Sequence, residues 1–599
     1  MALFSPSESP AVVVKEIDLT GGVPNVQSTT GAIVGNFRWG PAEERSLIAN
    51  ETELVEKFAS PDSDNTVDFH SASFFLRYSS SLQVVRSVTS EAKNSIGPVA
   101  VAGASAITPA TIKNKADFES VEAAQISTSN TFVGRFPGAL ANGLLISRCL
   151  ADSNAFEAWD YKTEFDGKPD TSNFIEDKNG QNDEIHVVVV DEQGKFTGTK
   201  GTVLERYPFL SLAKDAKNPS GSSIFVRDVI NERSEYVYMA AFDSDIQLVN
   251  TNQSGGTGGG VIGASGRLSG DSGENYAIAS SSITQVKDFN LASGADSKPL
   301  GKTEYVTGYD LFADKDQVEI DFIISPSLAD RTNHVALAND LIGKAAARKD
   351  CVAVVSPARD DVVNQTNSTT IVSNVVATAK AVTPFSSYAV QDGNFLKVFD
   401  KFNDQFIFIP ASSSTAGIMA ATDINRAAWF SPAGSRRGQY LGITALSFTP
   451  TKGERDTLYK NSVNPIANIP GSGVILFGDK TGLRRASAFD RINVRRLFLV
   501  LERAISRAAE QVLFEFNDEF TRAELVNIME PVLREVKGSR GITDFRVVAD
   551  ATNNTPEVID RNEFRADIFI KPARSINFVT LNFVAVRTGV DFEEVVGTV

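Results

Sequence analysis

The chain has 599 residues, of which 42% are hydrophobic and 22% are charged, so it is long enough for three or four domains and too apolar to be disordered. Its two isolated cysteines, Cys149 and Cys351, exclude a disulfide framework and favour two buried free thiols in a reducing compartment. The N-terminus lacks the regions of a signal peptide, and no stretch approaches the roughly 20 apolar residues that cross a bilayer. We therefore expect no export by signal peptide and no membrane insertion.

The net charge of −16 is distributed unevenly along the chain. Residues 430–599 hold 23 Lys and Arg against 21 Asp and Glu, whereas residues 1–429 hold 35 against 53. The balances are +2 and −18, which predicts an acidic exterior in one part and a neutral, contact-making surface in another. The overall acidity argues against nucleic acid as a partner.

Near the N-terminus, Ala11–Ile17 (AVVVKEI) has the pattern of a short strand between Pro10 and Gly21. Because an isolated strand has no stability of its own, this segment must pair with a sheet in this chain or in another. Next come a predicted strand at 30–35, a helix at 51–58 and a strand at 82–86.

Residues 91–310 are rich in Ser, Thr, Asn, Asp and Gly, with short strands predicted at 185–190 and 236–241. The stretch 254–273 has the composition of a glycine-serine linker. Gly258–Gly263 matches the dinucleotide-binding pattern of glycines, but no helix follows it, so we interpret it as linker. This region is predicted to form one or two inserted β-rich domains.

From residue 318 the pattern changes to a near-continuous apolar strand at 318–325, a helix at 332–349 and a second buried strand at 351–356. This order predicts a βαβ unit with two parallel strands. A helix is predicted at 370–381. A β-hairpin is predicted at 388–404, with Asp392-Gly393 as its turn.

The last third is the most regular part. Apolar residues at helical spacing predict an amphipathic helix at 493–514. A capping box at Thr521 and Glu524 begins another helix, which Gly538 ends. Strands are predicted at 542–549, 564–571 and 576–586, and a final strand-like piece at 592–596.

No residue pattern indicates catalysis. The three histidines, His70, His186 and His334, are far apart in the sequence and have no metal-ligand spacing. We expect no metal, no cofactor and no enzymatic activity. The alternative from the enzyme class is a hydrolase with its site hidden in residues 91–309, where His186 is the only histidine.

One cluster is unusually basic, with seven arginines against only Asp490 and Glu502. It is either a solvated helix face with local ion pairs or an electrostatic contact with an acidic partner. Nucleic acid is a third possibility, but no interleaved aromatic residues offer stacking surfaces. The members are Arg484, Arg485, Arg491, Arg495, Arg496, Arg503 and Arg507.

Several phrases of the sequence, read in order, resemble the tail sheath proteins of contractile-tailed phages. The resemblance covers roughly residues 1–90 and 310–599. It includes Phe37–Pro41 (FRWGP) and Phe430–Gly434 (FSPAG). Its strongest phrases are Phe489–Phe498 (FDRINVRRLF), Thr552–Pro556 (TNNTP) with Val558–Asn562 (VIDRN), and Pro572–Ile576 (PARSI).

The resemblance implies a virion protein, assembled in the host cytoplasm, that forms stacked hexameric rings around a tail tube. Contraction of the rings drives the tube through the host envelope to deliver the genome. The implied partners are further copies of the chain, the tail tube protein, and baseplate and tail terminator or neck proteins. The sheath of a phage-tail-like bacteriocin or contractile injection system is an alternative that the sequence leaves open.

The resemblance also implies that chain ends add strands to a sheet of a neighbouring subunit, and that the basic cluster faces the tube. We therefore expect reversal of Arg495 and Arg496 to weaken sheath assembly on tubes without unfolding the monomer. The candidates for strand exchange are Val12, Val13, Val14, Ile17, Phe592, Val595 and Val596.

The predicted fold is α+β multidomain, with inner core α/β and α+β domains formed from both chain ends and inserted β-rich outer domains. Its expected parts are an N-terminal exchange arm (1–20), an inner core domain (21–90 plus 310–440), the insertion (91–309), a C-terminal α+β domain (441–585) and a C-terminal exchange arm (586–599).

Overall fold

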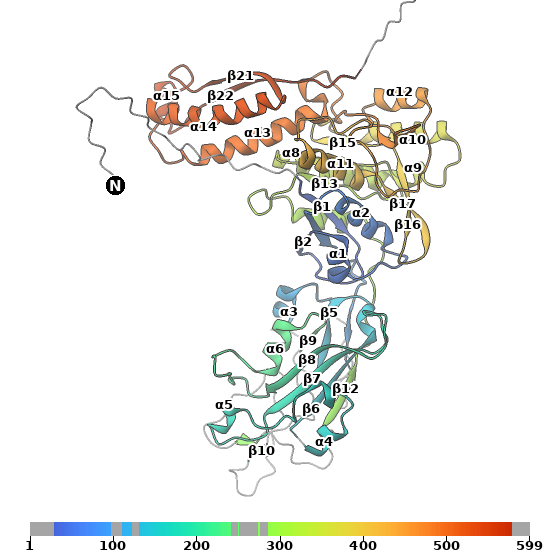
Figure 1. Ribbon diagram of the computed structural model, residues 1–599, viewed down its shortest axis with the longest axis vertical. Helices are drawn as coiled ribbons and strands as arrows, with labels where there is room; N and C mark the ends of the chain where they lie inside the picture. The colour runs from blue at the N-terminus through green and yellow to red at the C-terminus, as the bar shows by residue number, and fades with distance from the viewer. Residues whose placement is uncertain are drawn as a thin grey trace, which may run out of the picture. The chain divides into compact units, whose positions relative to one another are not determined.

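The computed structural model describes residues 29–97, 111–122, 131–151, 153–240, 249–250, 274–275 and 285–577. The chain divides into two compact units. The C-terminal unit comprises Arg426–Ser431 and the chain from Arg491, and the larger unit comprises Gln27–Asn425 and Pro432–Asp490. Helices and several separate sheets occur in the described chain, which confirms the predicted α+β multidomain class (Figure 1). Both exchange arms lie outside the described residues.

The centre of the larger unit is a six-stranded sheet built from two distant parts of the sequence. Its first four strands in sheet order are mutually parallel, β3 is parallel to β1, and only the edge strand β2 is antiparallel. The order is β15 (Ala389–Gln391), β14 (Val352–Val355), β13 (Phe322–Ile324), β1 (Gly31–Gly35), β3 (Leu82–Arg86) and β2 (Arg45–Ile48). The predicted βαβ unit is confirmed as β13, α8 (Arg331–Arg348) and β14.

Helices cover both faces of this sheet, which explains why its strands are apolar on both sides. Ala32 and Val34 pack with α7 (Lys302–Asp310) and α8. Gly31 and Gly35 point to the opposite face, where they meet Phe75 and Asp68 of α2 (Thr66–Leu76). Neighbouring helices are α1 (Glu51–Phe58), α9 (Arg359–Val362), α10 (Ser368–Ala381) and α11 (Ser412–Asn425).

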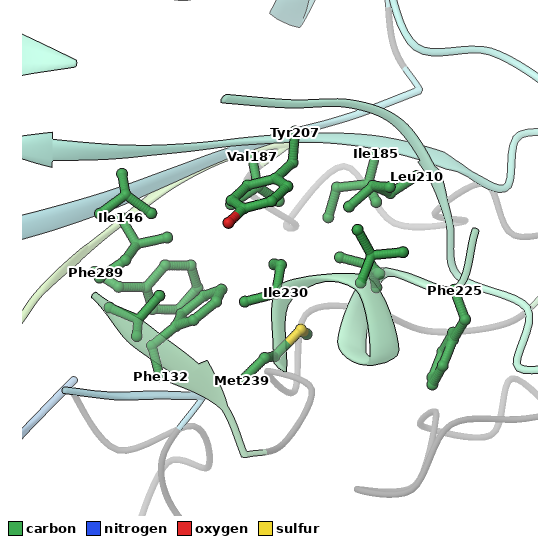
Figure 2. Packing of buried hydrophobic residues seen from close by; sticks show 14 of the residues in the cluster. Phe132, Ile146, Ile185, Val187, Tyr207, Leu210, Phe225, Ile230, Met239 and Phe289 are labelled. Atoms are coloured by element: carbon green, nitrogen blue, oxygen red, sulfur yellow. The ribbon is translucent and has the colours of Figure 1, made fainter. Parts of the chain in front are cut away.

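The chain between β3 and α7 forms two larger β-sheets within the larger unit, and its composition predicted a β-rich region. A four-stranded antiparallel sheet has the order β12 (Val286–Asn290), β6 (Leu144–Leu150), β7 (Glu184–Asp191) and β8 (Thr202–Ser211). A three-stranded sheet has the order β4 (Asn94–Ile96), β5 (Phe132–Pro137) and β9 (Val237–Met239). Figure 2 shows Tyr207, Val187 and Ile146 facing Ile230 and Met239 across one shared apolar core.

Short elements complete these modules. They are α3 (Lys115–Glu122), α4 (Ser153–Ala158), α5 (Asn173–Glu176), α6 (Val226–Arg233), β10 (Val249–Asn250), β11 (Glu274–Asn275) and the 3-10 turns Leu140–Gly143 and Lys162–Glu164. The predicted linker at 254–273 lies outside the described residues.

The predicted hairpin at 388–404 is wrong. β15 joins β14 in the six-stranded sheet, and the strand after Asp392 belongs to another sheet. The true hairpin joins β16 (Phe395–Asp400) to β17 (Gln405–Pro410), and β18 (Ala445–Leu446) completes that sheet. Asp392 is buried and accepts hydrogen bonds from Ser356 and Thr415, so tertiary contacts override its turn propensity.

Residues 432–490 pack with the larger unit, not with the C-terminal unit that we expected to begin at 441. Leu458 of α12 (Lys452–Lys460) packs with Val375 and Phe395. The hairpin of β19 (Ile466–Ile469) and β20 (Gly473–Leu476) contributes Ile466 and Leu476 to another cluster of the same unit. The boundary therefore lies at Arg491, just after the 3-10 turn Ala488–Asp490.

The C-terminal unit has two long helices and a two-stranded sheet. Its apolar core comprises Leu497 and Leu501 of α13, Leu533 and Val536 of α14, and Ile542 of β21. The elements are α13 (Ile492–Glu510), α14 (Glu519–Gly538), β21 (Ile542–Val548), α15 (Pro556–Ile559) and β22 (Asp567–Pro572).

Three boundaries of this unit test the sequence patterns. α13 ends four residues before the predicted Phe514. α14 begins earlier than the predicted capping box, because the carboxylate of Asp518 accepts from the backbone N–H of Thr521. Gly538 is the last residue of α14, as predicted. The third predicted strand, at 576–586, falls almost entirely outside the described residues.

Candidate functional site

The structure divides the basic cluster between the two units. Arg484 and Arg485 belong to the larger unit. The other five arginines lie in α13 or, in the case of Arg491, at its N-cap. Arg495 and Arg496 are only 6% and 3% exposed. They therefore do not offer an open contact surface in the subunit, which corrects the sequence expectation that reversing their charge leaves the monomer folded.

Three arginines of the cluster remain partly accessible along α13. Arg491, Arg503 and Arg507 are half-buried, and they lie on the flanks of a helix whose apolar stripe faces α14 and β21. The aliphatic stems of such long side chains can cover apolar surface.

Arg484 is held in place by two contacts within the larger unit. Its Nη2 donates to the carbonyl of Ala379 at 2.9 Å, and its Cζ lies 3.9 Å from the ring centre of Phe385. Partial burial lowers the pKa of Arg484 from its ordinary value. Lys380 and Arg485 are exposed beside these residues in the sequence. We call Lys380, Phe385, Arg484 and Arg485 the basic platform; among the described residues, none of its cations forms an ion pair.

The turn between α13 and α14 presents large apolar side chains to solvent. Phe514 is fully exposed, and Phe516, Phe520 and Leu513 are 84%, 77% and 60% exposed. We call these four residues the aromatic turn. The turn was not predicted, because the apolar stripe of the predicted helix extends to Phe514. The mixture of phenylalanines and acidic residues in 514–520 (FEFNDEF) breaks that stripe.

Acidic side chains surround the aromatic turn. Glu510, Glu515, Asp518 and Glu519 are all exposed. Within the part of the chain that the structure describes, none of these carboxylates forms an ion pair. Apolar side chains ringed by unneutralised charge of one sign are typical of a surface that binds another chain.

The two-stranded sheet of the C-terminal unit has room for additional strands. β21 and β22 pair with each other in antiparallel register, and among the described residues neither has a second partner. A strand with a free edge presents unpaired N–H and C=O groups to any extended segment that reaches it. The strand-exchange candidates Val12, Val13, Val14, Ile17, Phe592, Val595 and Val596 lie outside the described residues.

The titratable groups most suited to chemistry are buried and bonded to the fold. The Nε2 of His334 lies 2.8 Å from the carbonyl of Ser356, and burial lowers the pKa of His334 to about 4. The Nε2 of His186 lies 2.9 Å from the carbonyl of Gly167. Cys149 and Cys351 are buried free thiols, and burial raises the pKa of Cys351.

The described residues contain no group of three or more His, Cys, Asp and Glu side chains that would bind a metal ion. Likewise, no helix within the described ranges has the length and apolarity needed to span a bilayer.

Among the described residues, β21 and β22 pair only with each other, and the aromatic turn is exposed. Two family models match this chain in succession. The phage tail sheath protein central domain matches residues 301–482, and the phage tail sheath C-terminal domain matches residues 485–585. The second model begins at residue 485, a few residues before the C-terminal unit resumes at Arg491.

Curated relatives match almost end to end. The tail sheath protein of Salmonella phage ViI is 33% identical over 99% of this chain and 98% of its own length. The tail sheath protein of Vibrio phage KVP40 is 30% identical over 98% and 99%. A crystal structure of a sheath tail protein from Listeria innocua covers 91% of this chain and 96% of its own, with 12% identity and a TM-score of 0.49. The chain belongs to the phage tail sheath protein family.

Proposed function

We propose that this chain is the repeating subunit of a contractile phage tail sheath, without enzymatic activity. The observation that carries the proposal is its similarity, from end to end, to curated tail sheath proteins. The proposed assembly is a stack of six-membered rings around a tail tube, joined at its ends to baseplate and neck proteins. Contraction of this stack moves the tube through the host envelope and delivers the genome.

Strand addition is the proposed link between subunits. The free edges of β21 and β22 support it, because main-chain hydrogen bonds to an added strand tolerate rotation of the subunits that the strand connects. The donors are the N-terminal segment with Val12 to Ile17 and the C-terminal segment with Phe592 to Val596. Deletion of residues 1–17 is expected to abolish polymerisation while leaving a soluble monomer.

The proposed contact with the tube is made by the partly accessible arginines of α13. Arg491, Arg503 and Arg507 suit an acidic tube surface, and such an exposed electrostatic contact weakens as salt rises. A widening sheath would release these contacts without breaking the strand pairs between its subunits.

Negative-stain microscopy of the purified full-length chain tests the proposal. We expect sheath-like tubes with a regular axial repeat, either alone or on isolated tail tubes. A chain that stays monomeric with and without tubes, at all salt and protein concentrations, would contradict the assembly. The truncated chain without residues 1–17 is the matched comparison, since it changes only one proposed link.

A further inference from the structure

We infer that the aromatic turn of one subunit docks on the basic platform of a second copy of this chain. The inference rests on the proposed assembly into a sheath and adds a second contact to it, distinct from strand addition. The two surfaces lie in different structural units and carry opposite charge. The aromatic turn is apolar with acidic neighbours, and the basic platform carries three cations.

Exposure of the apolar side chains of the aromatic turn to water is unfavourable in free energy. Burying its four side chains on a partner removes their apolar surface from water, which favours association. The φ of Phe514 is +70°, in the left-handed region that a bulky residue rarely adopts, and Phe514 is the most exposed residue of the four. The turn (between α13 and α14 in Figure 1) therefore displays its aromatic rings instead of folding them onto its own core.

The acidic residues beside the aromatic turn favour a basic partner surface. Glu510, Glu515, Asp518 and Glu519 surround the aromatic rings, so the turn is disfavoured at an anionic membrane surface and favoured at a basic one. The basic platform has three cations without an ion pair among the described residues, and Phe385, 38% exposed, supplies an apolar centre. Arg484 is already fixed by Ala379 and Phe385, so little side-chain entropy is lost on binding.

The geometry of such a contact suits a polymer. A contact between two different surfaces of identical chains is heterologous when each surface meets a different neighbour, and repeated heterologous contacts generate closed rings or open helices. Each copy would offer its aromatic turn to one neighbour and its basic platform to another. A dimer with two-fold symmetry would not use both surfaces in this way.

A charge exchange tests the pairing. Two variants each reverse one surface: Glu515→Arg with Glu519→Arg, and Arg484→Glu with Arg485→Glu. Each is expected to raise the protein concentration at which full-length chains polymerise by about tenfold or more, measured by sedimentation. The chain that carries all four changes should return toward the wild-type concentration, because the two reversed surfaces attract each other again.

Controls separate this contact from folding and from other partners. Glu557→Arg with Asp560→Arg reverses two exposed charges, on α15 and at its C-cap in the same unit, and should polymerise like the wild type. Phe514→Ser with Phe516→Ser should keep the wild-type melting temperature and lose polymerisation. If these serine variants polymerise normally and lose only binding to tubes, the turn faces the tube and the inference is overturned.

Three further outcomes are decisive. If the variant with all four charge changes polymerises no better than either double variant, the pairing is also overturned. If the wild-type chain itself never polymerises, the proposed sheath function fails with it; if wild type and all variants polymerise alike, only this inference fails.

Discussion

The guanidinium of Arg86 donates to the main-chain carbonyl of Pro137, with 2.6 Å between Nη2 and the oxygen. Arg86 ends a strand of the six-stranded sheet, and Pro137 ends β5 of the inserted module. The same side chain donates to the carbonyls of Phe37 and Gly40 at 2.7 and 2.8 Å. One buried cation thus holds the FRWG loop and the inserted module to the central sheet.

Arg86→Met is expected to destabilise the larger unit by about 3 kcal/mol or more, because three buried carbonyls lose their donors while the apolar volume is nearly kept. Burial lowers the pKa of Arg86 to about 9, so the wild-type guanidinium is still charged at pH 7. Urea unfolding at pH 7 measures the loss. Arg233→Met, at an exposed position of α6, is the control and should change stability by less than about 0.5 kcal/mol.

Two glycines in neighbouring helices should respond oppositely to alanine. At Gly308 of α7, an added Cβ would lie 2.5 Å from Val34 Cγ1 and 2.6 Å from Ser87 Oγ, so Gly308→Ala should lower stability by about 1–3 kcal/mol. At Gly343 of α8 nothing lies within 4 Å of the added atom. Gly343→Ala should raise stability by up to about 1 kcal/mol through helix propensity. Equal melting temperatures for the two variants would contradict this packing of α7.

Burial of Asp392 makes its contribution to folding stability depend on pH. Its pKa is raised from 3.8 to about 7, because burial outweighs the hydrogen bonds from Ser356 and Thr415. Between about pH 4 and pH 7 the folded chain therefore holds a proton that the unfolded chain has lost, and stability contributed by this group falls as pH rises.

Asp392→Asn should remove this contribution, since an amide keeps the shape of the protonated carboxyl group and does not titrate. Relative to wild type, the variant should gain stability as the pH rises from 4.5 to 7.5. Asp68, whose pKa burial raises to about 6, adds a slope of the same sign in both proteins. Urea midpoints across this range make the comparison, and parallel curves for the two proteins would exclude the proposed protonation.

The sequence predicted elements whose signal is local. The apolar β13, α8 and β14 follow from periodicity alone, and so does the face of α13 that carries Leu497 and Leu501. Asp392-Gly393 misled because its turn chemistry is a local preference, while β15 is held by pairing with a strand more than 30 residues earlier. Pairing over such a distance leaves no periodic signal in a single sequence.

The candidate surfaces were only partly predictable for the same reason. Seven arginines close in sequence suggested one patch, but helical geometry turns Arg495 and Arg496 inward and the unit boundary separates Arg484 from α13. The contacts of Arg86 to two distant segments of chain could not be anticipated, because no spacing links residue 86 to Pro137. The aromatic turn required knowing where α13 ends.

Charge reversal should affect the buried and the half-buried arginines of α13 differently. Arg495→Glu with Arg496→Glu places two carboxylates in buried positions of α13, which should cost about 3–5 kcal/mol or unfold the C-terminal unit. Arg503→Glu with Arg507→Glu changes half-buried residues of the same helix and should leave a folded monomer that binds isolated tail tubes weakly. Circular dichroism and thermal unfolding report the fold, and co-sedimentation with tubes at low and high salt reports binding. Normal melting of the Arg495 and Arg496 variant would show that these side chains are accessible after all, and normal tube binding by the Arg503 and Arg507 variant would move the tube contact away from α13.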